Sequence, residues 1–435
     1  MASRNDDDVD LLEARGGRID PLRVPEGAFD DDSRIDQAIA ESFPASDPPS
    51  WNSGLDRNDK KASATQETRT GRAWRNEWAL PISIATMVLF LFFGKAWLAD
   101  LASRAWFALM LTWLFAAILL AAFGVVRHAE ALAERVGEPL GTLVLTLAMS
   151  GMEMMMIVAV MYTGRGAASL ARDTMLAILM IVLNGLVGGS LLLGGLRYRE
   201  QTYNLYGANT FLSVLVPLAV LSLVLPRFTV SAPGPIHSPV QAVALILTCV
   251  VLYGVFLSVQ TMRHREYFVM ADGAAKHADH EAAATGSSLT HAILLLSYAV
   301  TIVFMSKQIA VPIDYGINVL RAPAALGGLL VAVLILSPES LAALRAALAN
   351  KLQRSINLSL GTALSTISLT TPAVLIIGFM TGRDIILGLG AVDMVMLLLT
   401  LGVSLLTFAL ERTNVLQGAI HLVLFVAYLV LIFEN

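Results

Sequence analysis

Charged residues are scarce in this chain. Lys, Arg, Asp and Glu make up 15% of its 435 residues, whereas a typical soluble domain carries about 25%. Apolar runs of about 18 residues or more, long enough to cross a bilayer, recur from about Trp78 to the C-terminus. The composition excludes an ordinary soluble domain and predicts an all-α polytopic membrane protein.

Cysteine and paired histidine are also nearly absent. The single cysteine, Cys249, excludes an internal disulfide and a cysteine-based metal site. The predicted spans hold no histidine pair, which argues against zinc or copper. Neither a His-Glu-x-x-His motif nor a clear nucleophile–base pair is present, so we expect no enzyme activity. We also expect no bound cofactor and no nucleic-acid partner.

Residues 1–75 differ in composition from the rest of the chain. They are rich in Asp, Arg, Ser and Pro and lack long apolar runs, which predicts a disordered cytoplasmic N-terminal tail. Residues 35–43 have helical spacing, so a small docking helix is the alternative for that segment. The start is acidic and polar, and we expect no cleaved signal peptide. Residues 76–435 form the predicted transmembrane domain.

The apolar pattern of this domain predicts eleven membrane spans. They lie near residues 79–98, 105–126, 139–163, 174–196, 206–226, 239–261, 288–306, 323–344, 356–381, 385–410 and 416–433. Loops on the side of the N-terminal tail hold eleven Lys or Arg residues, against seven on the other side. Positive residues favour the cytoplasm, which predicts a cytoplasmic N-terminus.

Two lone carboxylates lie inside apolar stretches that resemble each other. The segments Leu140–Glu153 and Leu326–Glu339 align without a gap, with Leu-Gly at the start and Glu at the fourteenth position. An acid at bilayer depth costs about 2.5–3.5 kcal/mol on insertion scales. A chain that carries this cost twice at equivalent positions indicates a site for a transported ion or proton.

The two acids also indicate how the domain is organised. Glu153 lies in the third span and Glu339 in the eighth, so the two copies cross the membrane in opposite directions. This pattern is typical of transporters whose binding sites form between inverted repeats. We expect one extra helix and two five-helix repeats, at about 105–261 and 288–435, joined by a loop at 262–287.

Helix-disrupting residues precede both acids. They are Ser150 and Gly151 before Glu153, and Ser337 and Pro338 before Glu339. Such residues free backbone carbonyls to face a cavity. Together with two carboxylates they predict an all-oxygen site for a hard cation, with Glu153 and Glu339 as the metal ligands. The alternative is that each Glu is a protonated packing residue, but no Lys or Arg lies deep in the spans to neutralise it.

Other polar residues within the spans are weaker candidates for the same site. They are Asn184 in the fourth span, Gly361, Thr362, Ser365 and Thr366 in the ninth, and Asp393 in the tenth. The ninth span also carries Asn357, Ser368, Thr370 and Thr371. Hydroxyls often bond to their own helix instead. Asp393 fits a proton path or a bond between helices equally well, and His291 and His421 fit hydrogen-bonded packing.

The membrane domain resembles the bacterial ChaA-type cation/proton antiporters of the calcium/cation antiporter superfamily. The matching stretches are Val136 to Glu153, Asp173 to Gly195, Leu336 to Ser340, Gly361 to Pro372, Phe379 to Arg383, and Arg412 to Gly418 with His421. The resemblance implies exchange of Ca²⁺, or of Na⁺ and K⁺, for H⁺ across the bacterial inner membrane. It also implies that Glu153 and Glu339 occupy the two acid positions of the repeats.

The chain departs from this superfamily in the residues beside the acids. Relatives often read Gly-Asn-Ala-x-Glu, whereas this chain reads Ser150-Gly-Met-Glu and Ser337-Pro-Glu. Ile181 and Val182 are apolar where polar ligands are expected. We expect Ca²⁺/H⁺ exchange that exports the cation. Because these departures leave fewer oxygen ligands for Ca²⁺, Na⁺(K⁺)/H⁺ exchange at the same site is the alternative. The expected partners are inorganic cations, protons and the lipid bilayer, and homo-oligomerisation stays open.

Overall fold

The protein is described by a computed structural model. It covers residues 77–137, 140–163, 169–268, 287–410 and 412–434. The predicted tail at 1–75 and most of the loop predicted at 262–287 lie outside these residues.

Helix α3 (Ala79–Trp97) precedes the two predicted repeats. The first of them contains the following helical segments, several of which include short π turns. They are α4 (Arg104–Val136), α5 (Leu140–Thr163), α6 (Leu170–Met180), η1 (Ile181–Leu186), α7 (Val187–Tyr198), α8 (Leu205–Ala219), η2 (Val220–Val224), η3 (Leu225–Arg227), α9 (Pro239–Ser258), η4 (Val259–Arg263) and η5 (Arg265–Tyr267).

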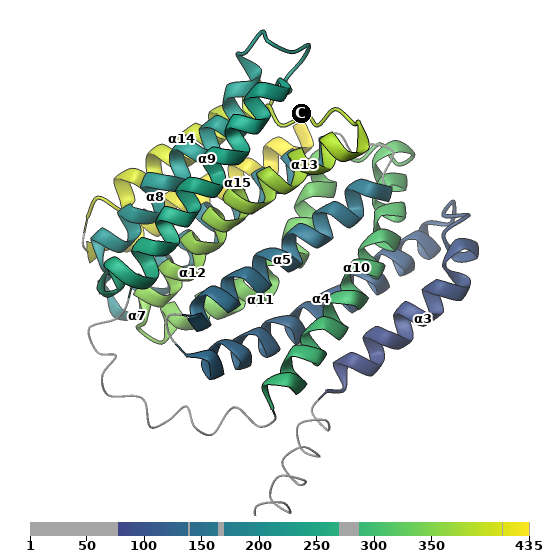
Figure 1. The fold of residues 1–435 in the computed structure, drawn as a ribbon, viewed down its shortest axis with the longest axis horizontal. Coiled ribbons are helices and arrows are strands. Elements are labelled where there is room, and N and C mark those ends of the chain that lie inside the picture. The colour runs from purple at the N-terminus through teal and green to yellow at the C-terminus, as the bar shows by residue number, and fades with distance from the viewer. Residues whose placement is uncertain (1–76, 138–139, 164–168, 269–286, 411, 435) are drawn as a thin grey trace, which may run out of the picture. The chain divides into compact units, whose positions relative to one another are not determined.

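The predicted second repeat follows in a similar order. It contains α10 (Ser288–Asn318), α11 (Ala324–Leu348), α12 (Leu352–Ser365), η7 (Thr366–Thr370), α13 (Thr371–Thr381), α14 (Ala391–Thr407) and α15 (Val415–Glu434). The π turns η1 and η7 lie in corresponding spans, the fourth and the ninth. Figure 1 shows α3, α4, α10, α5 and α11 on one side of the bundle and α8, α9, α14 and α15 on the other.

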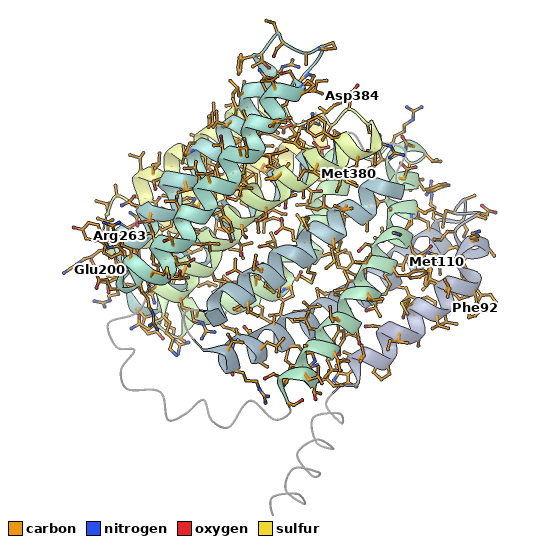
Figure 2. The ribbon with its side chains drawn as sticks, viewed as in Figure 1. Phe92, Met110, Glu200, Arg263, Met380 and Asp384 are labelled. Atoms are coloured by element: carbon orange, nitrogen blue, oxygen red, sulfur yellow. The ribbon has the colours of Figure 1, made fainter. Side chains whose placement is uncertain are left out.

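The helices confirm the prediction of an all-α, multi-pass membrane protein. Within the described residues, nine continuous helices are long and apolar enough to cross a membrane, and 144–160 and 391–407 form two shorter apolar helices. Large apolar side chains on the outer faces, such as Phe92 and Met380, are exposed, as expected where helices face lipid (Figure 2).

Three predicted span ends differ from the structure by six residues or more. The second span, predicted at 105–126, continues to Val136, and the seventh, predicted at 288–306, continues to Asn318. Hydropathy marks the apolar core of the bilayer, whereas a helix continues beyond it wherever good helix formers follow. The tenth span was predicted at 385–410, but α14 begins only at Ala391. Leu387 and Leu389 lie in the non-helical loop before it, where they are buried although they are not part of a span.

The two halves pack against each other rather than separately. Helix α11 packs against α6, and α5 packs against η7, so each Glu-bearing helix contacts the other half. Helix α4 packs against α10, and α3 contacts both. The two acids are therefore placed where elements of both halves meet.

Two short backbone contacts join the halves in a reciprocal way. Strand β1 (Gln201–Thr202), after α7, pairs with β2 (Arg412–Thr413), before α15. Ile386, after α13, forms an antiparallel bridge with Ile236, before α9. Each contact thus joins the end of one half's third span to the start of the other half's last span. This reciprocity fits a duplicated unit, and the inverted orientation of the copies stays a prediction.

Candidate functional site

The two predicted carboxylates lie on different helices and reach the same third span. Glu153 on α5 is 2% exposed and Glu339 on α11 is 8% exposed. Thr366 Oγ1 donates to Glu153 Oε2 at 3.0 Å, and Thr370 Oγ1 donates to Glu153 Oε1 at 3.4 Å. Thr362 Oγ1 lies 2.7 Å from Glu339 Oε2 and 2.9 Å from the carbonyl oxygen of Leu358. One span therefore supplies hydroxyl groups to both carboxylates.

The spacing of these threonines explains the arrangement. Residues four apart on a helix share one face, and Thr362, Thr366 and Thr370 follow this spacing through η7. At 1.5 Å per residue each step is about 6 Å along the helix. Glu339 acts electrostatically on Glu153, which fits carboxylates bound by successive turns.

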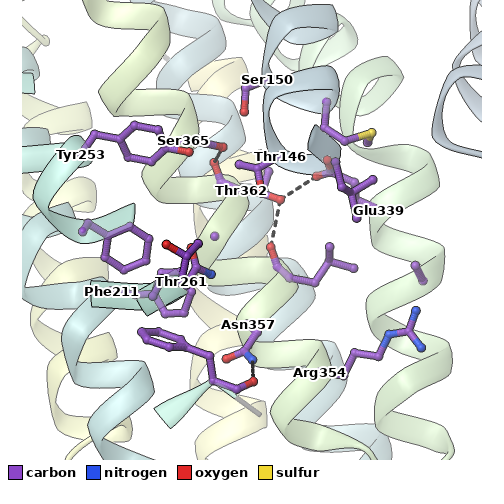
Figure 3. Close-up of a pocket in the computed structure, with 18 of the residues that line it drawn as sticks. Thr146, Ser150, Phe211, Tyr253, Thr261, Glu339, Arg354, Asn357, Thr362 and Ser365 are labelled. Carbon is purple, nitrogen blue, oxygen red and sulfur yellow. Dashed lines mark hydrogen bonds between the residues drawn. The ribbon is translucent and has the colours of Figure 1, made fainter. Parts of the chain in front are cut away.

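A cavity of about 360 Å³ leads to one of the two carboxylates. Glu339 lines it, together with Ser150 of α5 and with Gly361, Thr362 and Ser365 of α12. Glu153 is not among the lining residues. Figure 3 shows Glu339 and Thr362 on one wall, with the aromatic rings of Phe211 and Tyr253 opposite. A polar wall beside an apolar one is typical of small-ligand sites.

The other end of the cavity is lined by charged and amide residues at helix ends. Glu130 lies in the last turns of α4, Arg354 and Asn357 in the first turns of α12, and Arg265 in η5. Gln260 lies in η4. The cavity therefore runs from one end of these helices to Glu339.

The surroundings of the carboxylates suit a hard cation. Their hydrogen-bond partners in the described chain are threonine hydroxyls, with no Lys or Arg contact. Carboxylate and hydroxyl oxygens are the ligands that Ca²⁺ and alkali cations prefer. In the described residues no group of three or more His, Cys, Asp or Glu side chains could hold a metal ion. Two carboxylates and the threonine hydroxyls that contact them are therefore the groups available to bind a cation.

Several of the weaker predicted candidates lie at this site. Ser150, Gly361, Thr362 and Ser365 line the cavity. Thr366 contacts Glu153 directly. The structure thus brings together both acids and these five residues, and their role in ion binding stays a prediction.

Two candidates next to the acids do not contribute side-chain groups to the cavity. The Ser337 hydroxyl donates to the carbonyl oxygen of Val333 on its own helix, the alternative expected for helical hydroxyls. Gly151 has no heavy atom near its Cβ position and is not among the residues that line the cavity.

Asn184 is bonded elsewhere. Its Nδ2 donates to Thr400 Oγ1 at 2.8 Å, and its Oδ1 lies 3.2 Å from Nδ1 of His421. His421 Nε2 lies 3.0 Å from Thr407 Oγ1. Asn184 therefore joins η1 to α14 and α15, not to either glutamate. The hydrogen-bonded packing predicted for His421 is confirmed, as it is for His291, whose Nδ1 lies 3.0 Å from Nδ1 of His128.

Asp393 also lies apart from the two glutamates in its interactions. It occupies the first turn of α14. Its electrostatic neighbours are Asp173 and Arg172 at the start of α6. Asp393 therefore does not share the threonine hydroxyls that contact the two glutamates.

Sequence reasoning missed several residues around the cavity. Glu130 was outside the predicted span, since α4 was expected to end near residue 126. Tyr253 on α9 lines the cavity and interacts electrostatically with Glu153, but a tyrosine in an apolar span gives no specific signal. Thr370 was noted only as one of many hydroxyls, although its four-residue spacing from Thr366 could have singled it out.

Relatives of known sequence cover most of the chain. It is 44% identical over 319 residues to the sodium-potassium/proton antiporter ChaA of Escherichia coli (strain K12), covering 73% of this chain and 86% of that protein. It is 43% identical over 313 residues to a putative ionic transporter of Sinorhizobium fredii (strain NBRC 101917 / NGR234), covering 72% of this chain and 85% of the relative.

Solved structures share the fold at low sequence identity. The structure of native YfkE superposes with a TM-score of 0.63 at 15% identity and covers 82% of this chain and 100% of that one. The H⁺/Ca²⁺ exchanger CAX gives a TM-score of 0.54 at 14% identity, covering 80% of this chain and 88% of that one.

The family profile described as sodium/calcium exchanger protein matches residues 106–262 and 288–434. These two segments lie close to the two repeats predicted from the sequence. The matched residues make up well over half of the chain and include both glutamates. The chain therefore belongs to the sodium/calcium exchanger protein family.

Proposed function

We propose that this protein is a proton-coupled cation antiporter in which Glu153 and Glu339 alternately bind a cation and protons. The direction proposed is export from the cytoplasm, across the bacterial inner membrane. One observation carries the proposal. Two buried carboxylates from different halves face hydroxyls of one span, without a Lys or Arg contact among the described residues.

The charge of the pair supports exchange rather than simple binding. A buried carboxylate needs a compensating charge or a proton. When a cation leaves such a pair, protons are the simplest replacement, and an arriving cation must displace them. Because cation and protons compete for the same oxygens, the binding of one drives the release of the other. Coupling then needs only that access changes from one side to the other.

The cavity supports a role for Glu339 as the first carboxylate that a cation meets in this conformation. Glu339 lines the cavity, whereas Glu153 does not. Thr362 and Thr366, one turn apart, bridge the distance between the two acids. A cation that enters along Asn357 and Thr362 thus reaches Glu339 before Glu153.

Ca²⁺ is the first candidate cation, because the two carboxylates match its double charge. Na⁺ and K⁺ are the second candidate, and a specific observation favours them. The relative with 44% identity is a sodium-potassium/proton antiporter, and this chain lacks the amide residues beside the acids that superfamily relatives often carry. Ca²⁺ with six to eight oxygen ligands would need water molecules to complete its coordination.

Substitution of the acids tests the proposal. We expect Glu153→Gln and Glu339→Gln each to abolish cation-driven pH change in inverted membrane vesicles, since an amide neither carries charge nor exchanges a proton. Glu200→Gln is the matched control, because Glu200 is an exposed acid whose partner is Arg412. Normal exchange in either site variant, at equal protein level in the membrane, would refute the assignment.

The same vesicles distinguish the two candidate cations. Ca²⁺, Na⁺ and K⁺ are added in turn to wild-type vesicles with an imposed proton gradient. A response to Ca²⁺ alone supports Ca²⁺/H⁺ exchange. A response to Na⁺ or K⁺, together with no response to Ca²⁺, supports monovalent cation/H⁺ exchange at the same acids and contradicts Ca²⁺/H⁺ exchange.

A further inference from the structure

A second group of ionisable side chains lies away from the two glutamates. It consists of Arg172 and Asp173 at the start of α6, Asp393 in the first turn of α14, and Tyr428 on α15. Asp173 is 6% exposed, Tyr428 is 2% exposed and Asp393 is half-buried. Electrostatic interactions connect Asp393 to Asp173 and Arg172, and Tyr428 to both acids.

Arg172 and Asp173 are already engaged. Arg172 Nε donates to Asp173 Oδ1 at 2.8 Å, and its Nη1 donates to the carbonyl oxygen of Gly388 at 3.2 Å. Ser169 donates to the other oxygen of Asp173 at 3.1 Å. The guanidinium therefore compensates one acid and is tied to the loop before α14.

Asp393 and Tyr428 are left with unused oxygens. Across the described residues, Asp393 makes no hydrogen bond or ion pair, although it is half-buried in an apolar helix. The buried hydroxyl of Tyr428 likewise has no hydrogen-bond partner among those residues. Buried polar groups are nearly always satisfied in native proteins. The buried Tyr428 hydroxyl, which interacts electrostatically with Asp393 and Asp173, therefore indicates a partner where α14 packs against α6 and α15.

The net charge of the group indicates what that partner is. Two carboxylates and one guanidinium leave one negative charge, which matches a monovalent cation. Carboxylate and phenol oxygens are ligands that alkali cations accept. A divalent cation would leave an excess positive charge in partly buried surroundings, which is unfavourable.

The group lies at the end of the bundle away from the cavity mouth. The cavity is lined by Arg265 and by the first turns of α5, whereas Asp173 lies at the start of α6, the helix that follows the end of α5. Arg172 is bonded to Gly388, in the same loop as Asp384. Figure 2 shows Asp384 and Arg263 at opposite ends of the helices.

We propose that Asp393, with Asp173 and Tyr428, forms a second binding site, for a monovalent cation, at the end of the transporter opposite the cavity. The inference rests on the proposed function, because an antiporter must collect and release ions at both ends. The site is separate from the glutamate pair and is measurable without it.

Binding of ²²Na⁺ to the purified full chain tests this site directly. The background carries Glu153→Gln and Glu339→Gln together, so that the central acids contribute no charge. We expect saturable binding in this background, its loss on addition of Asp393→Asn, and weaker binding with Tyr428→Phe. Asp384→Asn is the matched control, since Asp384 is an exposed acid of the adjoining loop, and binding should persist.

Absence of saturable binding in the background, or its persistence with Asp393→Asn, would overturn the proposal. Circular dichroism and gel filtration establish that each variant is folded, and Tyr428→Phe provides a second variant that keeps all charges. The central mechanism is tested separately. Normal exchange by the glutamate variants would refute the antiport mechanism, whereas loss of ²²Na⁺ binding with Asp393→Asn would still support the second site.

Discussion

At the scale of residues, the hydroxyls that hydrogen-bond to the two acids all come from one membrane span. Thr362, Thr366 and Thr370 all belong to the ninth span. The fourth span carries Ile181 and Val182 around the start of its own π turn, and its Asn184 bonds to Thr400 instead. Each repeat thus supplies one carboxylate, whereas only the second repeat supplies the threonine hydroxyls that contact them.

Removing one of these hydroxyls should weaken cation binding without abolishing transport. A hydrogen bond to a charged group contributes about 1.5–3 kcal/mol, and 1.4 kcal/mol is a factor of ten in affinity. We expect Thr362→Val and Thr366→Val each to raise the apparent KM for the cation about tenfold or more in vesicle assays.

Thr381→Val is the control for these two variants. Thr381 is an exposed threonine near the end of the same span, where its hydroxyl donates to the carbonyl oxygen of Ile377. Its KM should match the wild type. An unchanged KM in both site variants would mean that the hydroxyls are not ligands.

At the scale of elements, close contact between α11 and α6 positions Glu339. A Cβ added at Gly328 would lie 2.6 Å from the backbone carbon of Asp173 and 2.7 Å from the nitrogen of Thr174. Small residues allow membrane helices to approach this closely. Because Gly328 and Glu339 share α11, this contact fixes where the acid-bearing helix lies.

Gly328→Ala should therefore destabilise the protein. Overpacking of a close contact costs about 1–3 kcal/mol, and here the opposing atoms are backbone and cannot rotate away. The measurement is the thermal unfolding midpoint of the detergent-purified chain. Gly402→Ala is the control, because no heavy atom lies within 4 Å of its Cβ position. Equal midpoints for the two variants would contradict the packing argument.

Helix α3 is attached to the bundle through a buried acid that sequence reasoning did not single out. Glu77, just before α3, accepts a hydrogen bond from Arg127 of α4. It accepts another from the hydroxyl of Tyr298 of α10, at 3.0 Å. Its Oε2 also lies 3.3 Å from Nε2 of His128. The extra helix is therefore bound to both α4 and α10 by one carboxylate.

At the scale of the whole molecule, the direction of transport depends on orientation. The bias of Lys and Arg predicts that the end with Arg263 and Glu200, where the cavity opens, faces the cytoplasm. Figure 2 shows Glu200 at this end and Asp384 at the other. Proposed cation export thus begins at the cavity mouth.

Cysteine labelling tests this orientation. The single native cysteine, Cys249, is buried, and Cys249→Ser provides a cysteine-free background. In intact cells we expect a membrane-impermeant maleimide to label Asp384→Cys and not Glu200→Cys, and the reverse in inverted vesicles. The opposite labelling pattern would mean that the cavity faces away from the cytoplasm, which would contradict the predicted orientation.

Much of the fold was predictable because bilayer chemistry is restrictive. The apolar runs located all eleven spans, since only helices satisfy their own backbone groups in lipid. Span ends were less predictable, as α4 and α10 continue beyond their apolar cores. The two acids were predictable because a buried charge stands out in an apolar run. Tyr253 in an apolar span gives no such signal, and the polar side chain of Asn184 did not reveal that its partners are Thr400 and His421.

The sequence by itself determined that this is a helical membrane protein with two acids at equivalent positions of two similar segments, because composition and spacing are local properties of the chain. Only the tertiary structure decided which residues meet those acids. It directed Asn184 toward His421, separated Asp393 from the glutamates, and placed Thr370 beside Glu153. The reason is physical. Hydrogen bonds depend on the relative rotation and depth of packed helices, and these follow from contacts between distant parts of the chain.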